Sequence, residues 1–147
     1  MRFRRLAVVV TGCLVAVAVA APLLDSAPVR GPFFATLRGA SEPAGGDPNG
    51  RGSFTAIIHG RRLCFGMTVG HIGTPIAAHI HRGVAGVAGP IVEPLRRPAR
   101  GGLGTSSACT VLTQALANQI RATPGRYYVN VHTGAYPDGA VRGQLRR

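Results

Sequence analysis

Alternation between apolar and polar residues divides the chain after residue 32 into short segments with the period of a β-strand. In the clearest of them, 63–69, every second residue from Leu63 to Val69 is apolar. One face of this strand is therefore predicted to meet a core, while Cys64 lies on the other face. Similar segments cover 33–37, 52–58, 76–81, 91–95, 127–133 and 140–145. Glycine- and proline-rich turns separate them, a pattern typical of an antiparallel β-sandwich.

A different period is found in the segment 110–121. Its apolar residues recur at four-residue steps and form one stripe, which consists of Leu112, Leu116 and Ile120. This spacing predicts a single short helix, with Thr110 as its N-cap and Pro124-Gly125 at its end. The polar segment 96–104 that precedes it is predicted to be a surface loop. The expected fold is therefore an all-β antiparallel sandwich with one short helix.

The N-terminal residues differ in composition from the rest of the chain. A basic start precedes an uncharged apolar stretch, and Ala18-Val19-Ala20 fits the small-residue pattern of a cleavage site. We predict a signal peptide at 1–20, a proline- and alanine-rich linker at 21–32 and the folded domain at 33–147. The alternatives are an uncleaved membrane anchor and a lipoprotein signal at Cys13. In each case the domain is secreted or extracytoplasmic, and it meets a membrane only through its leader.

The chain is strongly basic, with 17 arginines, no lysine, five acidic residues and a formal charge of +12. Such a charge can indicate a nucleic-acid partner, because phosphates attract clustered cations. Here the arginines are scattered, and no run of them exceeds two residues. An exported protein also seldom meets a genome. We therefore expect no nucleic-acid partner, and loose, salt-sensitive adhesion to an anionic cell envelope stays open.

Beyond the predicted leader the chain contains two cysteines, Cys64 and Cys109. Two cysteines in an oxidising compartment are usually bridged, so we predict a disulfide between them. Closing a loop of about 45 residues would stabilise the fold by roughly 4 kcal/mol in the chain-entropy model. Two buried free thiols or a cysteine-containing metal site are the alternatives.

Three of the five histidines lie in strand-like segments with a definite facing. Because side chains alternate along a strand, His79 and His81 share one face and Ile80 takes the other. In the later segment His132 lies opposite Val131 in the same way. If the aliphatic residues face the core, all three imidazoles point to the solvent side. Neutral imidazole nitrogens are ligands for copper and zinc, so these histidines form a candidate metal site.

The acidic residues do not form a pair that could catalyse hydrolysis. Glu42, Asp47, Glu93 and Asp138 belong to different loops or strand ends, whereas a glycosidase needs two facing carboxylates. We expect Glu42 or Glu93 to form an ion pair with Arg142 that braces the sheet ends. Asp138 is expected to stabilise a Pro-Asp-Gly turn. Since no serine lies in a Gly-x-Ser-x-Gly elbow either, we predict a protein that is not an enzyme.

Three separated motifs resemble the CHRD domain, a module named after chordin and common in secreted bacterial proteins. They are AAHIHRG at 77–83, YVNVHT at 128–133 and P-x-G-x-x-RGQL at 137–145, and the start at 37–43 is also similar to that of the family. The resemblance covers roughly 33–145. It implies a β-sandwich and carries no defined catalytic activity.

Copper-zinc superoxide dismutase offers an analogy for the topology and for the site. It is a Greek-key sandwich that holds copper outside its barrel, partly through an H-x-H pair and a later strand histidine. His79, His81 and His132 are similar to these elements, so we expect a Greek-key sandwich here. The bridging histidine and the zinc loop have no counterpart, because 82–90 contains neither His nor Asp. Dismutase activity is therefore not expected.

Two functions remain open on the sequence alone. The first is a secreted, non-catalytic interaction module of the cell envelope or extracellular space, whose partner is an unknown protein or envelope polymer. The alternative is binding of copper or zinc by the three histidines. A structural role is the competing interpretation of the histidines, in which His79 and His81 form hydrogen bonds to Asn130, Thr133 or turn carbonyls.

Overall fold

The computed structural model describes residues 31–100 and 103–147. The strands are β1 (Phe33–Arg38), β2 (Arg51–His59), β3 (Arg62–Gly70), β4 (Pro75–Arg82), β5 (Ile91–Leu95), β6 (Leu103–Val111), β7 (Tyr127–Thr133) and β8 (Val141–Gln144). The helices are α1 (Gln114–Ala122) and two 3-10 helices, η1 (Gly39–Ser41) and η2 (Pro124–Arg126). The predicted signal peptide lies outside the described residues, as does nearly all of the linker. Within the described ranges no helix is long and apolar enough to cross a bilayer.

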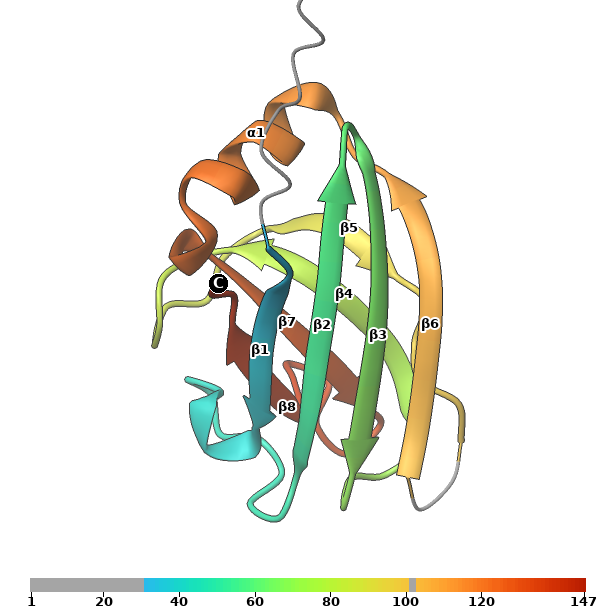
Figure 1. Ribbon diagram of the computed structural model, residues 1–147. Coiled ribbons are helices and arrows are strands. Elements are labelled where there is room, and N and C mark those ends of the chain that lie inside the picture. The colour runs from blue at the N-terminus through green and yellow to red at the C-terminus, as the bar shows by residue number, and fades with distance from the viewer. Residues whose placement is uncertain (1–30, 101–102) are drawn as a thin grey trace, which may run out of the picture.

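The strands form one antiparallel sheet in the order β5-β4-β7-β8-β1-β2-β3-β6. This sheet bends over on itself, so that β1, β2, β3 and β6 make a front layer and β8, β7, β4 and β5 a back layer (Figure 1). The chain passes from β5 at one edge to β6 at the other and returns as β7 between β4 and β8. This is a Greek-key arrangement. The predicted all-β antiparallel sandwich with one short helix is confirmed.

The two edges of the sheet approach each other without forming a strand pair. The Thr110 hydroxyl of β6 donates a hydrogen bond of 2.6 Å to the Glu93 carboxylate of β5. Beside β6, the backbone N–H of Ala99 donates to the carbonyl of Thr105 at 2.8 Å. These contacts bring the sandwich close to a closed barrel.

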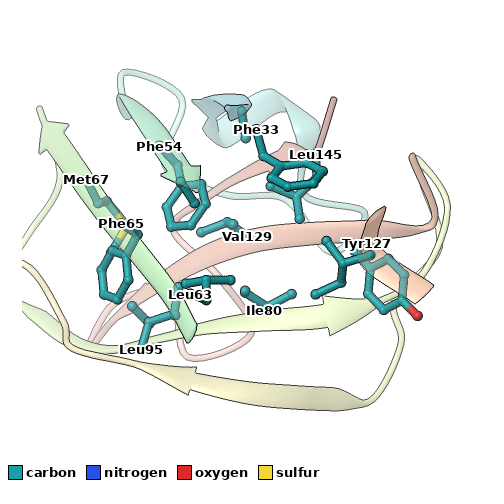
Figure 2. Close-up of a cluster of buried hydrophobic side chains, with 14 of the residues drawn as sticks. Phe33, Phe54, Leu63, Phe65, Met67, Ile80, Leu95, Tyr127, Val129 and Leu145 are labelled. Carbon is teal, nitrogen blue, oxygen red and sulfur yellow. The ribbon is translucent and has the colours of Figure 1, made fainter. Parts of the chain in front are cut away.

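The hydrophobic core fills the space between the two layers (Figure 2). From the front layer, the rings of Phe54 and Phe65 stack with their centroids 5.6 Å apart. Ile80 and Val129 face them from the back layer and are fully buried. Burying side chains of this size contributes about 1.5 to 3 kcal/mol each. The predicted apolar face of 63–69 is confirmed, because Leu63, Phe65, Met67 and Val69 all lie in this core.

The structure differs from the sequence prediction at the start of the helix. Thr110, predicted as the N-cap, lies in β6 instead, and α1 begins at Gln114. The N-cap is Thr113, whose side chain accepts a hydrogen bond of 3.1 Å from the N–H of Leu116. The reason is that β6 pairs with β3 along its whole length, which outweighs a local four-residue spacing. The predicted apolar stripe itself is buried, with Leu112, Leu116 and Ile120 all in the core.

A disulfide joins Cys64 of β3 to Cys109 of β6, as predicted. The two residues stand directly opposite each other in the register of the strands. The intervening chain includes β4 and β5, so the bridge ties the front layer across a connection that visits the back layer. It therefore fixes the position of the edge strand β6.

Candidate metal centre

Strands β4 and β7 bring the three histidines together on the outer face of the back layer. The two strands are antiparallel neighbours, and His79 is paired with Asn130, two residues before His132. Ile80 and Val131 are fully buried on the core side of these strands. Because side chains alternate along a strand, the histidines take the opposite side, as the sequence predicts.

The nitrogens of the three imidazoles are close enough to share a small ion. The Nδ1 of His79 lies 3.0 Å from the Nε2 of His132. One nitrogen from each of His79, His81 and His132 lies within 4.8 Å of the other two. The His79 ring meets the others edge-on, at 65° to His132 and 78° to His81. The His81 and His132 rings are tilted at 40° with their centroids 6.3 Å apart.

Backbone carbonyls orient two of the imidazoles. The Nδ1 of His81 lies 2.8 Å from the carbonyl oxygen of Gly89, and the Nδ1 of His132 lies 2.8 Å from that of Pro137. Since a carbonyl only accepts, each Nδ1 must carry the proton, which leaves each Nε2 unprotonated. The Nε2 of His132 accepts the hydrogen bond of 3.0 Å from Nδ1 of His79. The Nε2 of His81 is buried and has no hydrogen-bond partner. This is the tautomer in which metal-binding histidines are commonly held.

The histidines are less exposed than the sequence predicts. His81 and His132 are only 8% and 9% exposed, although solvent-side positions were expected. The physical reason is a covering segment, residues 83–90, which we call the cap. It supplies the Gly89 carbonyl to His81, while the turn at 136–139 supplies the Pro137 carbonyl to His132. The candidate site thus lies beneath loops rather than on an open strand face.

Polar side chains of the back layer fasten the cap. Nη2 of Arg142 donates to the carbonyls of Val84 and Val87 at 2.8 and 3.0 Å. Nε2 of Gln144 donates to the carbonyl of Gly83 at 2.6 Å. At the far end, the N–H of Gly89 donates to the Tyr128 hydroxyl at 3.1 Å. The cap is therefore held along most of its length.

Burial favours the neutral form of two of the histidines. Desolvation lowers the pKa of His79, and the neighbouring His132 and His81 lower it further. Desolvation also lowers the pKa of His81, although its hydrogen bond to the Gly89 carbonyl opposes this effect. A neutral imidazole is the form that binds a metal ion. These two histidines are thus in the metal-binding form at neutral pH.

The predicted ion pair of Arg142 with Glu42 or Glu93 stays a prediction. Glu93 accepts a hydrogen bond from Thr110. Oε1 of Glu42 and Nη1 of Arg142 are both buried without a hydrogen-bond partner. The guanidinium is directed to the cap carbonyls and lies 3.3 Å above the centre of the Tyr128 ring. Burial raises the pKa of Glu42 to about 7, although the charge of Arg142 acts in the opposite direction.

Asp138 lies in the turn that was predicted for it. The N–H of Gly139 donates to the carbonyl of Tyr136 at 3.2 Å, which closes the turn. Gly139 has φ +140°, and a Cβ there would overlap the Glu42 carboxylate. That Asp138 stabilises the turn through its own side chain stays a prediction.

Sequence reasoning named Asn130 as a partner of the histidines but gave no role to the aromatic neighbour Tyr128. The Tyr128 ring stacks on His81 with centroids 4.8 Å apart. Asn130 is 2% exposed and pairs with His79 across the strands. A signal was present, because Tyr128 and Asn130 alternate with valines on the face of His132. The structural interpretation expected bonds from His79 or His81 to turn carbonyls, and the bond of His81 to the Gly89 carbonyl confirms one of them. The extent to which residues 83–90 cover the histidines was not predicted.

Comparison with known proteins places these features in a family context. The sequence model of the CHRD domain matches residues 33–145. The matched range includes all eight strands and the three histidines. No curated protein and no solved structure matches the chain.

Proposed function

The chain belongs to the CHRD domain family, whose members are non-enzymatic modules of extracellular type, and we propose that it is a secreted binding module for one copper or zinc ion. The ligands are His79, His81 and His132. The observation that carries this proposal is the convergence of three imidazoles, two of which are already oriented by backbone carbonyls. The protein needs no catalytic group for this function.

The distances suit a single ion. Metal–nitrogen bonds of about 2.0 to 2.1 Å place the nitrogens of a tetrahedral site about 3.3 Å apart. The Nδ1 of His79 and the Nε2 of His132 share a hydrogen bond of 3.0 Å, so they are already near this spacing and an ion would replace the shared proton. The separations of up to 4.8 Å within the cluster are wider, so an ion would draw the three nitrogens together. Binding would also give the buried Nε2 of His81 a partner, which relieves an unsatisfied group that costs about 1 to 3 kcal/mol.

The ligand set favours copper and zinc over harder ions. All three ligands are imidazoles, whereas magnesium and calcium prefer oxygen. Both cysteines of the described domain are engaged in the disulfide, so no thiolate is available there. Three protein ligands leave one position of a tetrahedral ion for solvent or a small ligand. The partly exposed side of His79 gives access to that position.

Calorimetric titration of the metal-free domain with Cu(II) and Zn(II) tests the proposal. We expect one ion per chain at neutral pH, with affinity falling as the pH drops through the imidazole range near 6.5, because protons compete for the same nitrogens. His81→Ala with His132→Ala should weaken binding about 100-fold or more. Circular dichroism would show whether the double variant keeps the β-fold.

His59 and His71 supply the matched control. They are the remaining two histidines of the chain, and both are exposed in turns or at strand ends. His59→Ala with His71→Ala removes the same number of imidazoles and should leave binding unchanged. Equal affinity in the wild type and in the His81/His132 variant would contradict a metal site. It would leave those histidines with the structural role that their bonds to the Gly89 and Pro137 carbonyls supply.

The proposed secretion has a separate test. Expression of the full chain with its leader, followed by intact mass measurement of exported protein, should give a product that begins after residue 20. Retention of residues 1–20 would favour the membrane anchor instead. The disulfide supports export, because such bonds persist in oxidising compartments.

A further inference from the structure

The outer face of the front layer carries a block of hydroxyl side chains. In the register of β1, β2, β3 and β6, one row across the sheet consists of Thr36, Ser53, Thr68 and Thr105. The next row adds Thr55 and Ser107, with Gly66 between them. We call these six Ser and Thr residues the hydroxyl face. Their neighbours along each strand are buried or partly buried, so the hydroxyls point away from the core.

Exposed arginines border the hydroxyl face on three sides. Arg38 and Arg51 are directly opposite each other at one end of it. Nη2 of Arg146 donates a hydrogen bond of 3.1 Å to the Thr36 hydroxyl on the β1 side. Arg96 and Arg97 stand on the opposite side, beside the edge strand β6. Each of these arginines is exposed.

No acidic residue balances these charges within the strands. The sequences of β1, β2, β3 and β6 contain no Asp or Glu at all. Arg38 pairs with Arg51 in the register of β1 and β2, so two exposed arginines stand opposite each other in one row. Like charges placed directly opposite each other on a sheet are destabilising. An anionic ligand would remove this repulsion.

The surface is hollowed where the hydroxyls lie. Two adjoining grooves, of about 790 and 520 Å³, meet at Thr68. Gly66 lies on the floor of the larger groove, and a Cβ there would have no neighbour within 4 Å. The wall formed by 96–99 is fixed to β6, because the Ser106 hydroxyl donates to the carbonyl of Arg96 at 2.6 Å. The groove is thus built from ordered backbone on both sides.

We propose that the hydroxyl face binds a carboxylated polysaccharide. Arginine forks match carboxylates in a bidentate geometry, and Ser and Thr hydroxyls both donate to and accept from sugar hydroxyls. Phe34 is 41% exposed and opposite Thr55 in the register, so its ring is available to the apolar side of a sugar. Single-stranded nucleic acids are commonly bound by several stacking rings, and these four strands present one exposed Phe or Tyr ring, Phe34. This site lies on the other layer from the histidines and does not depend on metal binding.

Binding of polygalacturonate to the full domain, measured by calorimetry, tests the proposal. The wild type should bind polygalacturonate and not neutral dextran. Arg38→Gln with Arg51→Gln should weaken binding by about tenfold for each arginine. Gly66→Glu places a negative charge on the floor of the groove and should also weaken it. Thermal melting confirms that each variant is folded.

Arg82→Gln with Arg126→Gln is the matched control, because it removes two exposed arginines outside the front layer. This variant should bind polygalacturonate as the wild type does. An equal loss in both double variants would overturn the proposal in favour of diffuse charge attraction. Poly-L-glutamate is a polyanion without hydroxyls and should bind more weakly than polygalacturonate. Equal or tighter binding of poly-L-glutamate or duplex DNA would overturn the choice of a polysaccharide.

Discussion

The outer faces of the two layers are both polar, yet they are built in opposite ways. On the back layer, β4 and β7 present histidines beneath the cap, and His81 and His132 are nearly buried. On the front layer, β2 and β3 present hydroxyls that stay open to solvent between exposed arginines. Burial lowers the pKa of His79 and His81 and keeps them neutral, which suits a metal ion. Exposure keeps the arginines charged, hydrated and available to a large anionic partner.

Two neighbouring arginines give the sharpest version of this comparison. Arg142 is 1% exposed and donates to two cap carbonyls, whereas its direct strand partner Arg38 is exposed. Arg142→Ala should lower the free energy of unfolding by about 3 to 5 kcal/mol, because it leaves buried polar groups unpaired and a cavity behind. Arg38→Ala should change it by less than about 0.5 kcal/mol. Urea denaturation measures both, and similar values for the two variants would contradict the contrast between the layers.

The front layer has a covalent constraint that the back layer lacks. Replacing Cys64 and Cys109 by Ala should lower the free energy of unfolding by about 2 to 4 kcal/mol in the chain-entropy account. The bridge lies in β3 and β6, so metal binding by β4 and β7 should persist in the folded fraction. Chemical denaturation and metal titration of the same variant check the two statements. Loss of metal binding from folded protein would show that the layers are coupled.

Two glycines illustrate the difference between the covered outer face of the back layer and the open outer face of the front layer. A Cβ at Gly89 would lie 1.7 Å from the carbonyl oxygen of Arg82, whereas one at Gly66 would meet nothing within 4 Å. Gly89→Ala should therefore displace the end of the cap and cost about 2 kcal/mol. Gly66→Ala should be neutral or stabilise by about 0.5 to 1 kcal/mol, since glycine is unfavourable inside a strand. Thermal melts distinguish these signs, and a neutral Gly89→Ala would mean that the cap can be moved without cost.

A pH-dependent effect on stability is expected from the buried carboxyl of Glu42. Burial raises its pKa from 4.5 to about 7, so the folded state binds this proton more tightly than the unfolded chain. Stability from this group is present below pH 4.5 and is lost as the pH rises through about 7. Glu42→Gln should remove that loss, a difference of about 1 to 2 kcal/mol between about pH 5 and about pH 8. Urea titrations at the two pH values measure it.

The contribution of the histidines to stability changes with pH in the opposite direction, which provides a control in the same protein. Burial lowers the pKa of His79 and His81 below 6.5, so their contribution is present above 6.5 and is lost as the pH falls. Glu42→Gln should leave this loss of stability at acidic pH unchanged. A variant whose stability still falls between neutral and alkaline pH would contradict the role of Glu42.

The sequence predicted most strands of this protein well, and it predicted the loops that cover the histidines poorly. Strand alternation alone placed His79, His81 and His132 on one side, and the cysteine count predicted the disulfide. The edge strand β6 was missed, because the Leu112, Leu116 and Ile120 spacing extended the helical pattern backward over Thr110. The strand identity of 103–111 comes from pairing with β3, a long-range contact that local spacing does not contain.

The burial of the histidines was missed for a similar reason. The cap sequence is rich in glycine and alanine, which is typical of an ordinary loop. Its position depends on carbonyl contacts with Arg142 and Gln144, which lie more than 50 residues away in the chain. The hydrogen bonds of the Arg142 guanidinium to the Val84 and Val87 carbonyls were missed for the same reason.

The two edge strands of the sheet, β5 and β6, have a consequence for self-association. A free edge strand normally offers a row of unpaired N–H and carbonyl groups with which a second molecule can pair. Here Pro94 in β5 has no N–H to donate, and the segment 96–99 covers part of the free edge of β6. Neither edge strand presents a continuous template, so the domain is protected against growing into edge-to-edge fibres even at high concentration.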